Sequence, residues 1–93
     1  MTGEDHPPAP KISRLATLLS DNGLSELAPS LVEPHRNQRG LWRIKFNYED
    51  SEALSMETDQ AATLAGHLRH LGATDLADEV EGAVAQAKRY RTM

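Results

Sequence analysis

The chain has 93 residues, of which 10 are basic and 14 acidic, and it carries a net charge of −4 and no cysteine. This length accommodates one small domain, which buries only about 60–65% of the surface that its unfolded chain exposes. The composition excludes disulfides, a thiol nucleophile and cysteine-ligated zinc, and the acidic balance disfavours a protein that coats DNA.

The N-terminal segment, residues 1–10 (MTGEDHPPAP), contains glycine, three prolines and polar residues without apolar periodicity. This composition predicts a disordered tail, followed by a single domain over residues 11–93. The segment lacks the pattern of a signal peptide, and no apolar run approaches 18 residues. We therefore expect a cytoplasmic protein that does not enter a membrane.

A first helix is predicted to begin near Lys11 and to end at residues 21–23 (DNG), where Asn and Gly tolerate the left-handed conformation. Its apolar residues recur at helical spacing: Ile12, Leu15, Ala16 and Leu19. Ser25 is expected to cap a second, short helix. Pro29 removes one backbone donor near its first turn, and Pro34 ends it.

Residues 40–48 (GLWRIKFNY) change to a period of two. Apolar and polar side chains alternate, which predicts a strand with one buried and one solvent-facing side. After a polar turn, residues 53–57 (ALSME) are expected to return as a second strand, with Leu54 and Met56 on one face. A lone hairpin is not stable in water, so we expect it to lie on the helices.

Two further helices are predicted, the first capped by Thr58 and ended by Gly72, the second capped by Thr74 or Asp75. The first has the apolar stripe Ala61, Leu64, Ala65, Leu68 and Leu71. The second has the stripe Leu76, Val80, Ala83, Val84, Ala87 and Tyr90. Acidic residues near its start and basic residues near its end (Lys88, Arg89 and Arg91) suit the helix dipole.

Residues 15–33 and 64–82 can be aligned, as LATLLSDNGLSELAPSLVE and LAGHLRHLGATDLADEVEG. Either one helix-turn-helix unit was duplicated or two helical hairpins converged on the same apolar pattern, and the second explanation is favoured because Leu, Ala and Gly are common. The predicted fold is α+β and mostly helical. Two helical hairpin-like segments flank a short antiparallel β-hairpin in a single small domain.

The residues that favour catalysis or metal binding are few. His67 and His70 are neighbours on a helix, but the obvious third ligand, His35, lies in another segment, so solvated histidines are the favoured interpretation. An acidic cluster around residues 49–59 fits a polar turn and a helix start better than acid–base chemistry. No nucleophile elbow, phosphate loop or dinucleotide fingerprint occurs. The sequence therefore predicts a non-enzyme without a cofactor or a metal site.

Residues 34–48 carry four cations and no acid in an otherwise acidic chain. Arg43 and Lys45 should project from one strand face, about 6–7 Å apart. This face is either an ordinary solvated surface or a binding surface for an acidic protein or a nucleic-acid backbone. Trp42 would favour binding if it were exposed, because Trp beside Arg is typical of interface hot spots. The predicted partner-binding residues are Arg36, Arg39, Trp42, Arg43 and Lys45.

Residues 51–90 resemble a ribbon-helix-helix unit in the order of strand, helix, glycine turn and longer helix. The resemblance implies a dimer paired through the strand, with strand side chains in the DNA major groove. The chain departs from this pattern because Ser55 and Glu57 would point outward, and an acid opposes DNA binding.

Gly82, Ala83 and Ala87 favour close helix packing, either within the chain or in a homodimer seam.

These observations predict a small adaptor or regulatory module that binds an acidic protein through the basic hairpin face. The alternative is a small nucleic-acid-binding transcriptional regulator, ribbon-helix-helix-like or other, that uses the same face.

Overall fold

A computed structural model describes the backbone of residues 10–91 and the side chains of residues 14–91. In chain order, the elements are α1 (Pro10–Asp21), β1 (Leu31–Arg36), β2 (Trp42–Asn47), β3 (Leu54–Glu57), α2 (Thr58–His70) and α3 (Thr74–Arg91). The three strands form one antiparallel sheet in the order β1-β2-β3, which confirms the α+β class. The predicted tail lies, apart from Pro10, outside the described residues, and Pro10 already belongs to α1.

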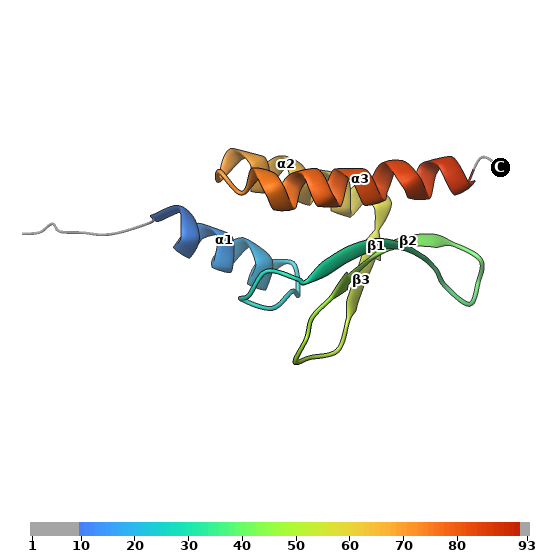
Figure 1. Cartoon of the computed structure of the whole chain (residues 1–93), viewed down its shortest axis with the longest axis horizontal. Coiled ribbons are helices and arrows are strands. Elements are labelled where there is room, and N and C mark those ends of the chain that lie inside the picture. The colour runs from blue at the N-terminus through green and yellow to red at the C-terminus, as the bar shows by residue number, and fades with distance from the viewer. Residues whose placement is uncertain (1–9, 92–93) are drawn as a thin grey trace, which may run out of the picture.

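The fold has two layers, because α2 and α3 lie side by side over one face of the sheet (Figure 1). Strand side chains alternate between the two faces, and the even-numbered ones point to the helices. Ile44 and Phe46 on the central strand are 0% exposed, and Val32 and Met56 are buried on either side of them. The helices contribute the predicted apolar stripes to the same core. The odd-numbered side chains form the opposite face, which none of the described helices covers.

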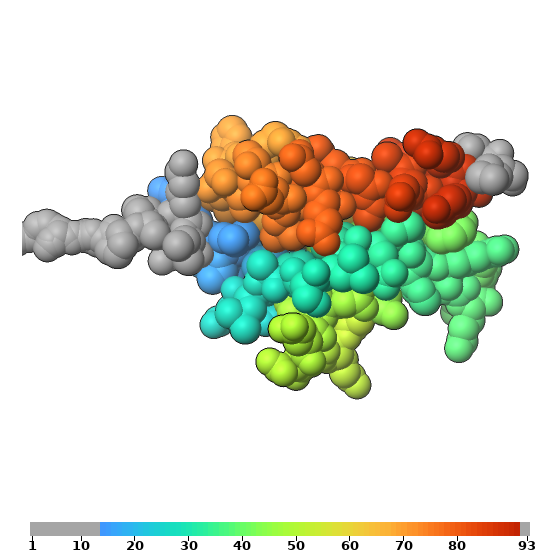
Figure 2. Space-filling view, in the orientation of Figure 1, coloured from blue at the N-terminus to red at the C-terminus, as the bar shows by residue number. Residues whose placement is uncertain are grey.

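The α1 helix lies at one end of the molecule, beside the start of β1 (Figures 1 and 2). It ends as predicted at Gly23, whose φ of 77° is the left-handed conformation. The Leu24 amide donates to the Leu19 carbonyl and the Gly23 amide to that of Ser20, which is the Schellman arrangement. Leu19 and Leu24 are both buried, so this helix end is the part of α1 that anchors it to the core.

The second helix predicted near Ser25 does not form, and the chain instead enters β1 at Leu31. The two-hairpin description is therefore only partly confirmed: α2 and α3 form one helical hairpin, whereas residues 15–33 do not form another. Pro34, expected to end a helix, lies inside an edge strand. Its missing N–H is tolerated there because it falls at a position that faces away from β2.

The other elements agree closely with the predicted ones. β2 and β3 form the predicted hairpin, and α2 and α3 have the predicted range, with Gly72 between them at a φ of 90°. Two corrections concern helix starts. Thr74 and Asp75, predicted to cap α3, are its first two helical residues. Glu57, not Thr58, is the N-cap of α2 and forms a capping box with Gln60, while Thr58 is the first helical residue and is buried. None of the described helices has the length and apolarity needed to cross a membrane.

Candidate interaction surface

The turn between β1 and β2 holds two of the predicted partner-binding residues, Arg36 and Arg39, in exposed positions. Hydrogen bonds between residues of the turn itself fix its geometry. The Asn37 amide donates to the Leu41 carbonyl at 2.8 Å, and the Asn37 side-chain oxygen accepts from the amides of Arg39 and Leu41 at 2.9 Å each. Gly40 supplies the left-handed residue, with a φ of 82°, that such three-residue turns require. Arg39 is therefore exposed on an ordered tip, whereas the Arg36 guanidinium folds back over the turn and donates to the Gly40 carbonyl at 3.4 Å.

Arg43 and Lys45 share the uncovered face of the sheet, as their spacing predicted. The register adds an acid beside each of them. Glu57 of β3 lies opposite Arg43, and Glu33 of β1 lies opposite Lys45. Opposite charges at directly paired positions attract one another across a sheet. Neither pair is joined by a hydrogen bond: Glu33 accepts from the Asn47 side chain at 3.0 Å, and Arg43 donates to the Ser55 hydroxyl at 3.3 Å. The two acids lower the net positive charge of this face, and only Glu33 could not be foreseen, because its strand was not predicted.

Trp42 lies on the other face of β2, which separates it from Arg43 and Lys45. It is half-buried, and its ring centroid is 5.0 Å from that of Tyr90 at an interplanar angle of 39°. Arg36 is its register partner on β1 and lies on the same face. The predicted set therefore divides into Arg36 and Trp42 towards α3, Arg43 and Lys45 on the uncovered face, and Arg39 at the tip.

The C-terminal end of α3 reaches the base of the hairpin tip, an arrangement that sequence reasoning missed. Tyr90 contacts Trp42, and the Arg91 guanidinium donates to the Thr58 hydroxyl at 3.0 Å. A cavity of about 390 Å³ lies between the tip, the start of α2 and the end of α3. It is lined by Gly40, Leu41, Trp42, Arg43, Glu57, Thr58, Asp59 and Arg91. Of the three cations in the last turn of α3, Arg91 lines this cavity, whereas Lys88 and Arg89 are exposed on the helix and do not line it.

Both edges of the sheet are partly closed to strand addition. In β1 the even-numbered residues turn their backbone groups away from β2. The Val32 amide donates to the Glu79 carboxylate of α3 at 2.8 Å, and Pro34 has no amide. On β3 the Arg43 guanidinium donates to the Ser55 carbonyl at 3.4 Å and the Glu57 amide to Gln60 at 3.3 Å. Recognition by β-augmentation is therefore disfavoured.

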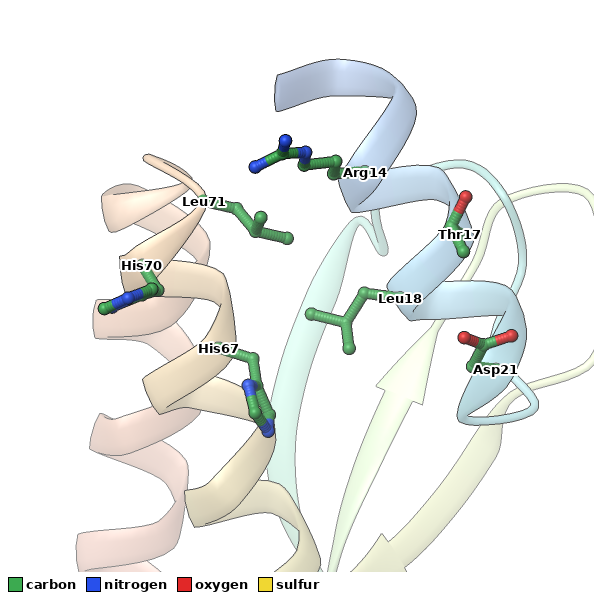
Figure 3. Close-up of a pocket in the computed structure, with 7 residues that line it drawn as sticks. All are labelled: Arg14, Thr17, Leu18, Asp21, His67, His70 and Leu71. Carbon is green, nitrogen blue, oxygen red and sulfur yellow. The ribbon is translucent and has the colours of Figure 1, made fainter. Parts of the chain in front are cut away.

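A second cavity, of about 410 Å³, lies between α1 and α2 (Figure 3). Leu18 and Leu71 point toward one another across it, and His67 and His70 line its α2 side. Asp21 is its one acidic lining residue among those the structure describes. In the described part of the chain, no three His, Asp or Glu side chains come together in a way that could hold a metal ion. The described side chains that line this groove do not come together in an arrangement that would hold a ligand or a metal ion.

The small residues of α3 have a role inside the chain. Ala83 and Ala87 are buried in the core. Gly82 is exposed, and a Cβ placed on it would meet nothing within 4 Å. No element of the described chain therefore requires a glycine at this position. The homodimer seam remains a prediction.

Arg69, a cation that lies away from the hairpin, forms ion pairs within the chain. Its guanidinium is hydrogen-bonded to Asp78 at 2.8 Å and to Glu81 at 2.5 Å, which joins α2 to α3. These two hydrogen bonds raise the pKa of Arg69 above its ordinary value. Arg69 is thus paired within the chain. At the hairpin tip and in the last turn of α3, cations outnumber acids.

No known protein family, no curated protein and no solved structure matches this chain.

Proposed function

We propose that the protein is a small non-enzymatic interaction module that engages an acidic partner through the cations of the β1–β2 hairpin. The observation that carries this proposal is the tip at residues 36–41, which is ordered by its own hydrogen bonds. It exposes Arg39 and Leu41 and holds the Arg36 guanidinium across Gly40. A binding loop that is already ordered loses little conformational entropy when it binds. Charges at such a tip steer association and select partners of opposite charge.

We place the proposed contact at the tip rather than on the strand face. Arg43 and Lys45 face acids in register, so they contribute less net positive potential than their spacing predicted. These same acids disfavour the nucleic-acid alternative, because a phosphate backbone laid along the sheet would meet Glu33 and Glu57. A protein partner carries both signs of charge and can accommodate such a surface.

A capture experiment with the tagged protein tests this proposal. The wild type, the tip variant Arg36→Glu/Arg39→Glu and the face variant Arg43→Ala/Lys45→Ala are incubated with source-cell lysate, with and without nuclease. Lys11→Glu/Arg14→Glu has the same charge change as the tip variant and lies on α1, so it is the matched control. We expect a nuclease-resistant protein band that the tip variant loses and the control retains.

Two results would contradict the proposal. If the recovered material is nucleic acid and nuclease removes it, the regulator alternative holds instead. If the wild type and the tip variant recover the same protein, the hairpin cations do not form the binding surface.

A further inference from the structure

Cations from two segments about 50 residues apart in the sequence meet at one end of the molecule. We call this set the basic end: Arg36, Arg39, Arg43, Lys88, Arg89 and Arg91. The hairpin tip and the end of α3 extend to the same side in Figures 1 and 2. The Trp42–Tyr90 ring contact and the shared cavity fix the two segments against each other.

The basic end also exposes apolar surface. Leu41 is 58% exposed and Tyr90 is 42% exposed, although both are large side chains next to a core that buries most others. Tyr, Trp and Arg are the residue types most enriched in binding hot spots. Apolar anchors surrounded by charges are the usual anatomy of a protein interface.

Most acids of the described chain lie away from this end, on the first half of α3, in residues 49–52 and near the end of α1. Charges more than about 8 Å apart in solvent are largely screened at physiological ionic strength. The net charge of −4 therefore does not describe the basic end, which presents a local positive potential. Glu57 and Asp59 are the acids that line its cavity, beside Arg43 and Arg91.

We infer that the basic end is one continuous binding surface for an acidic protein segment that carries an aromatic or aliphatic anchor residue. This inference rests on the proposed function and deepens it, because it adds the last turn of α3 to the hairpin tip. The anchor packs on Leu41 and Tyr90, and the flanking carboxylates face the guanidinium groups.

Two features favour a peptide over a nucleic acid. One face of the Trp42 ring is occupied by Tyr90, so that stacking of a base on this face is blocked. Glu57 and Asp59 would repel phosphates at the cavity but can accept hydrogen bonds from the amides of a peptide.

The test uses a defined probe, a peptide of about 13 residues in which Asp and Glu alternate around one central Phe. Binding is followed by the emission of Trp42, which is the one tryptophan in the chain, and by the anisotropy of a fluorescein-labelled copy. The same peptide with Ala in place of Phe tests the anchor, and a single-stranded DNA oligonucleotide of equal charge tests the alternative. Titrations at two salt concentrations test the electrostatic contribution.

The deciding variant is Lys88→Glu/Arg89→Glu, which leaves the hairpin unchanged. We expect it to weaken binding about tenfold, because exposed charge pairs each contribute up to about 1 kcal/mol. Arg36→Glu/Arg39→Glu should weaken binding by at least as much, whereas the control Lys11→Glu/Arg14→Glu should change it less than about twofold. Acidic residues in the last turn destabilise a helix, so the folding of this variant is checked by circular dichroism. If it is unfolded, binding by Lys88→Gln/Arg89→Gln provides the test instead.

The outcomes separate the two proposals. If the hairpin variant loses binding and both α3 variants bind as the wild type does, the basic end is not one surface but the proposed function stands. If the peptide does not bind even at about 1 mM, or if no hairpin variant affects it, both proposals are wrong. If the DNA binds more tightly than the peptide, the partner class is wrong.

Discussion

The contact between Trp42 and Tyr90 joins β2 to the end of α3 and lies at the centre of the basic end. The sequence indicated that both residues point inward, because each falls in phase with the apolar stripe of its element. It did not indicate that they meet, because periodicity within an element says nothing about contacts between elements. Exposure of Trp42 would have favoured a binding role, but the ring is half-buried between the core and Tyr90.

Removing the Tyr90 ring should loosen this end of the molecule. We expect Tyr90→Ala to lower the free energy of unfolding by about 1–2 kcal/mol, since an aromatic pair contributes about 0.5–1.5 kcal/mol beyond the area that it buries. The emission of Trp42 should shift to longer wavelength as its ring becomes solvated. Tyr90→Phe keeps the ring and is the control, and a loss of stability as large as that of the alanine variant would show that the hydroxyl, not the ring, matters.

Tyr48 offers a pH-dependent prediction. Its hydroxyl is buried without a hydrogen-bond partner, and burial raises the pKa of Tyr48 above its ordinary value of 10, against a smaller opposing effect of the Ser25 backbone. The folded state therefore holds this proton more tightly than the unfolded state does. The stabilisation that this pKa difference contributes is fully present below about pH 10, and it is lost as the pH rises through the pKa of Tyr48 in the folded state.

Tyr48→Phe should be as stable as the wild type at neutral pH, or more stable by up to about 1 kcal/mol, because it removes an unpaired polar group. Chemical denaturation between about pH 7 and pH 11 measures the difference between the two proteins. It should widen in favour of Phe above about pH 10. A constant difference over this range would show that Tyr48 does not titrate differently in the folded state.

At the scale of elements, β1 is the clearest failure of prediction. Leu31 and Val32 are adjacent apolar residues, so this segment has no clear alternation, and the Pro34 that follows indicates an end to regular structure. Pro34 is accommodated because β1 is an edge strand, and the position of a strand in a sheet is a tertiary property. The helices α1, α2 and α3 and the hairpin of β2 and β3 were predicted because their apolar periodicity is local, whereas the prediction of a helix near Ser25 was wrong.

The bond from the Val32 amide to Glu79 should hold this edge strand against α3. We expect Glu79→Ala to lower the free energy of unfolding by about 1–2 kcal/mol and to speed hydrogen exchange at the Val32 amide. Glu79→Gln keeps an acceptor and should retain most of the protection. Unchanged exchange at Val32 in the alanine variant would show that water replaces the carboxylate at little cost.

The exposed glycines of α2 and α3 test the predicted homodimer. A Cβ at Gly66 or Gly82 would lie in open space, so Ala at either position should stabilise the helix by about 1 kcal/mol. If the protein forms a dimer whose seam crosses Gly82, only Gly82→Ala should weaken association in sedimentation experiments. Gly66→Ala is the matched control, and equal effects of the two variants would argue against a seam on α3.

At the scale of the whole molecule, the sequence predicted the class of the fold and the presence of a basic segment, but not the distribution of charge. The acids opposite Arg43 and Lys45 come from β1 and β3, and the cations that reinforce the hairpin tip come from α3. The outward position of Glu57 could be predicted from the sequence. The position of Glu33 opposite Lys45 and the approach of α3 to the tip could not, because they depend on strand order and on the direction of α3. Lys88, Arg89 and Arg91 were explained by the helix dipole alone, and the second role proposed for them emerges from the fold.

The most direct measurement is a heteronuclear NMR titration of the full chain with the acidic Phe-containing peptide. We expect the amide chemical shifts of residues 36–43 and 88–91 to change together. Both segments should report the same affinity for the peptide, and this affinity should fall as salt is added. The uncovered sheet face at Lys45 and the groove between α1 and α2 should change little. Shifts that cluster in that groove, or that involve the hairpin without α3, would contradict the claim that the basic end is the binding surface.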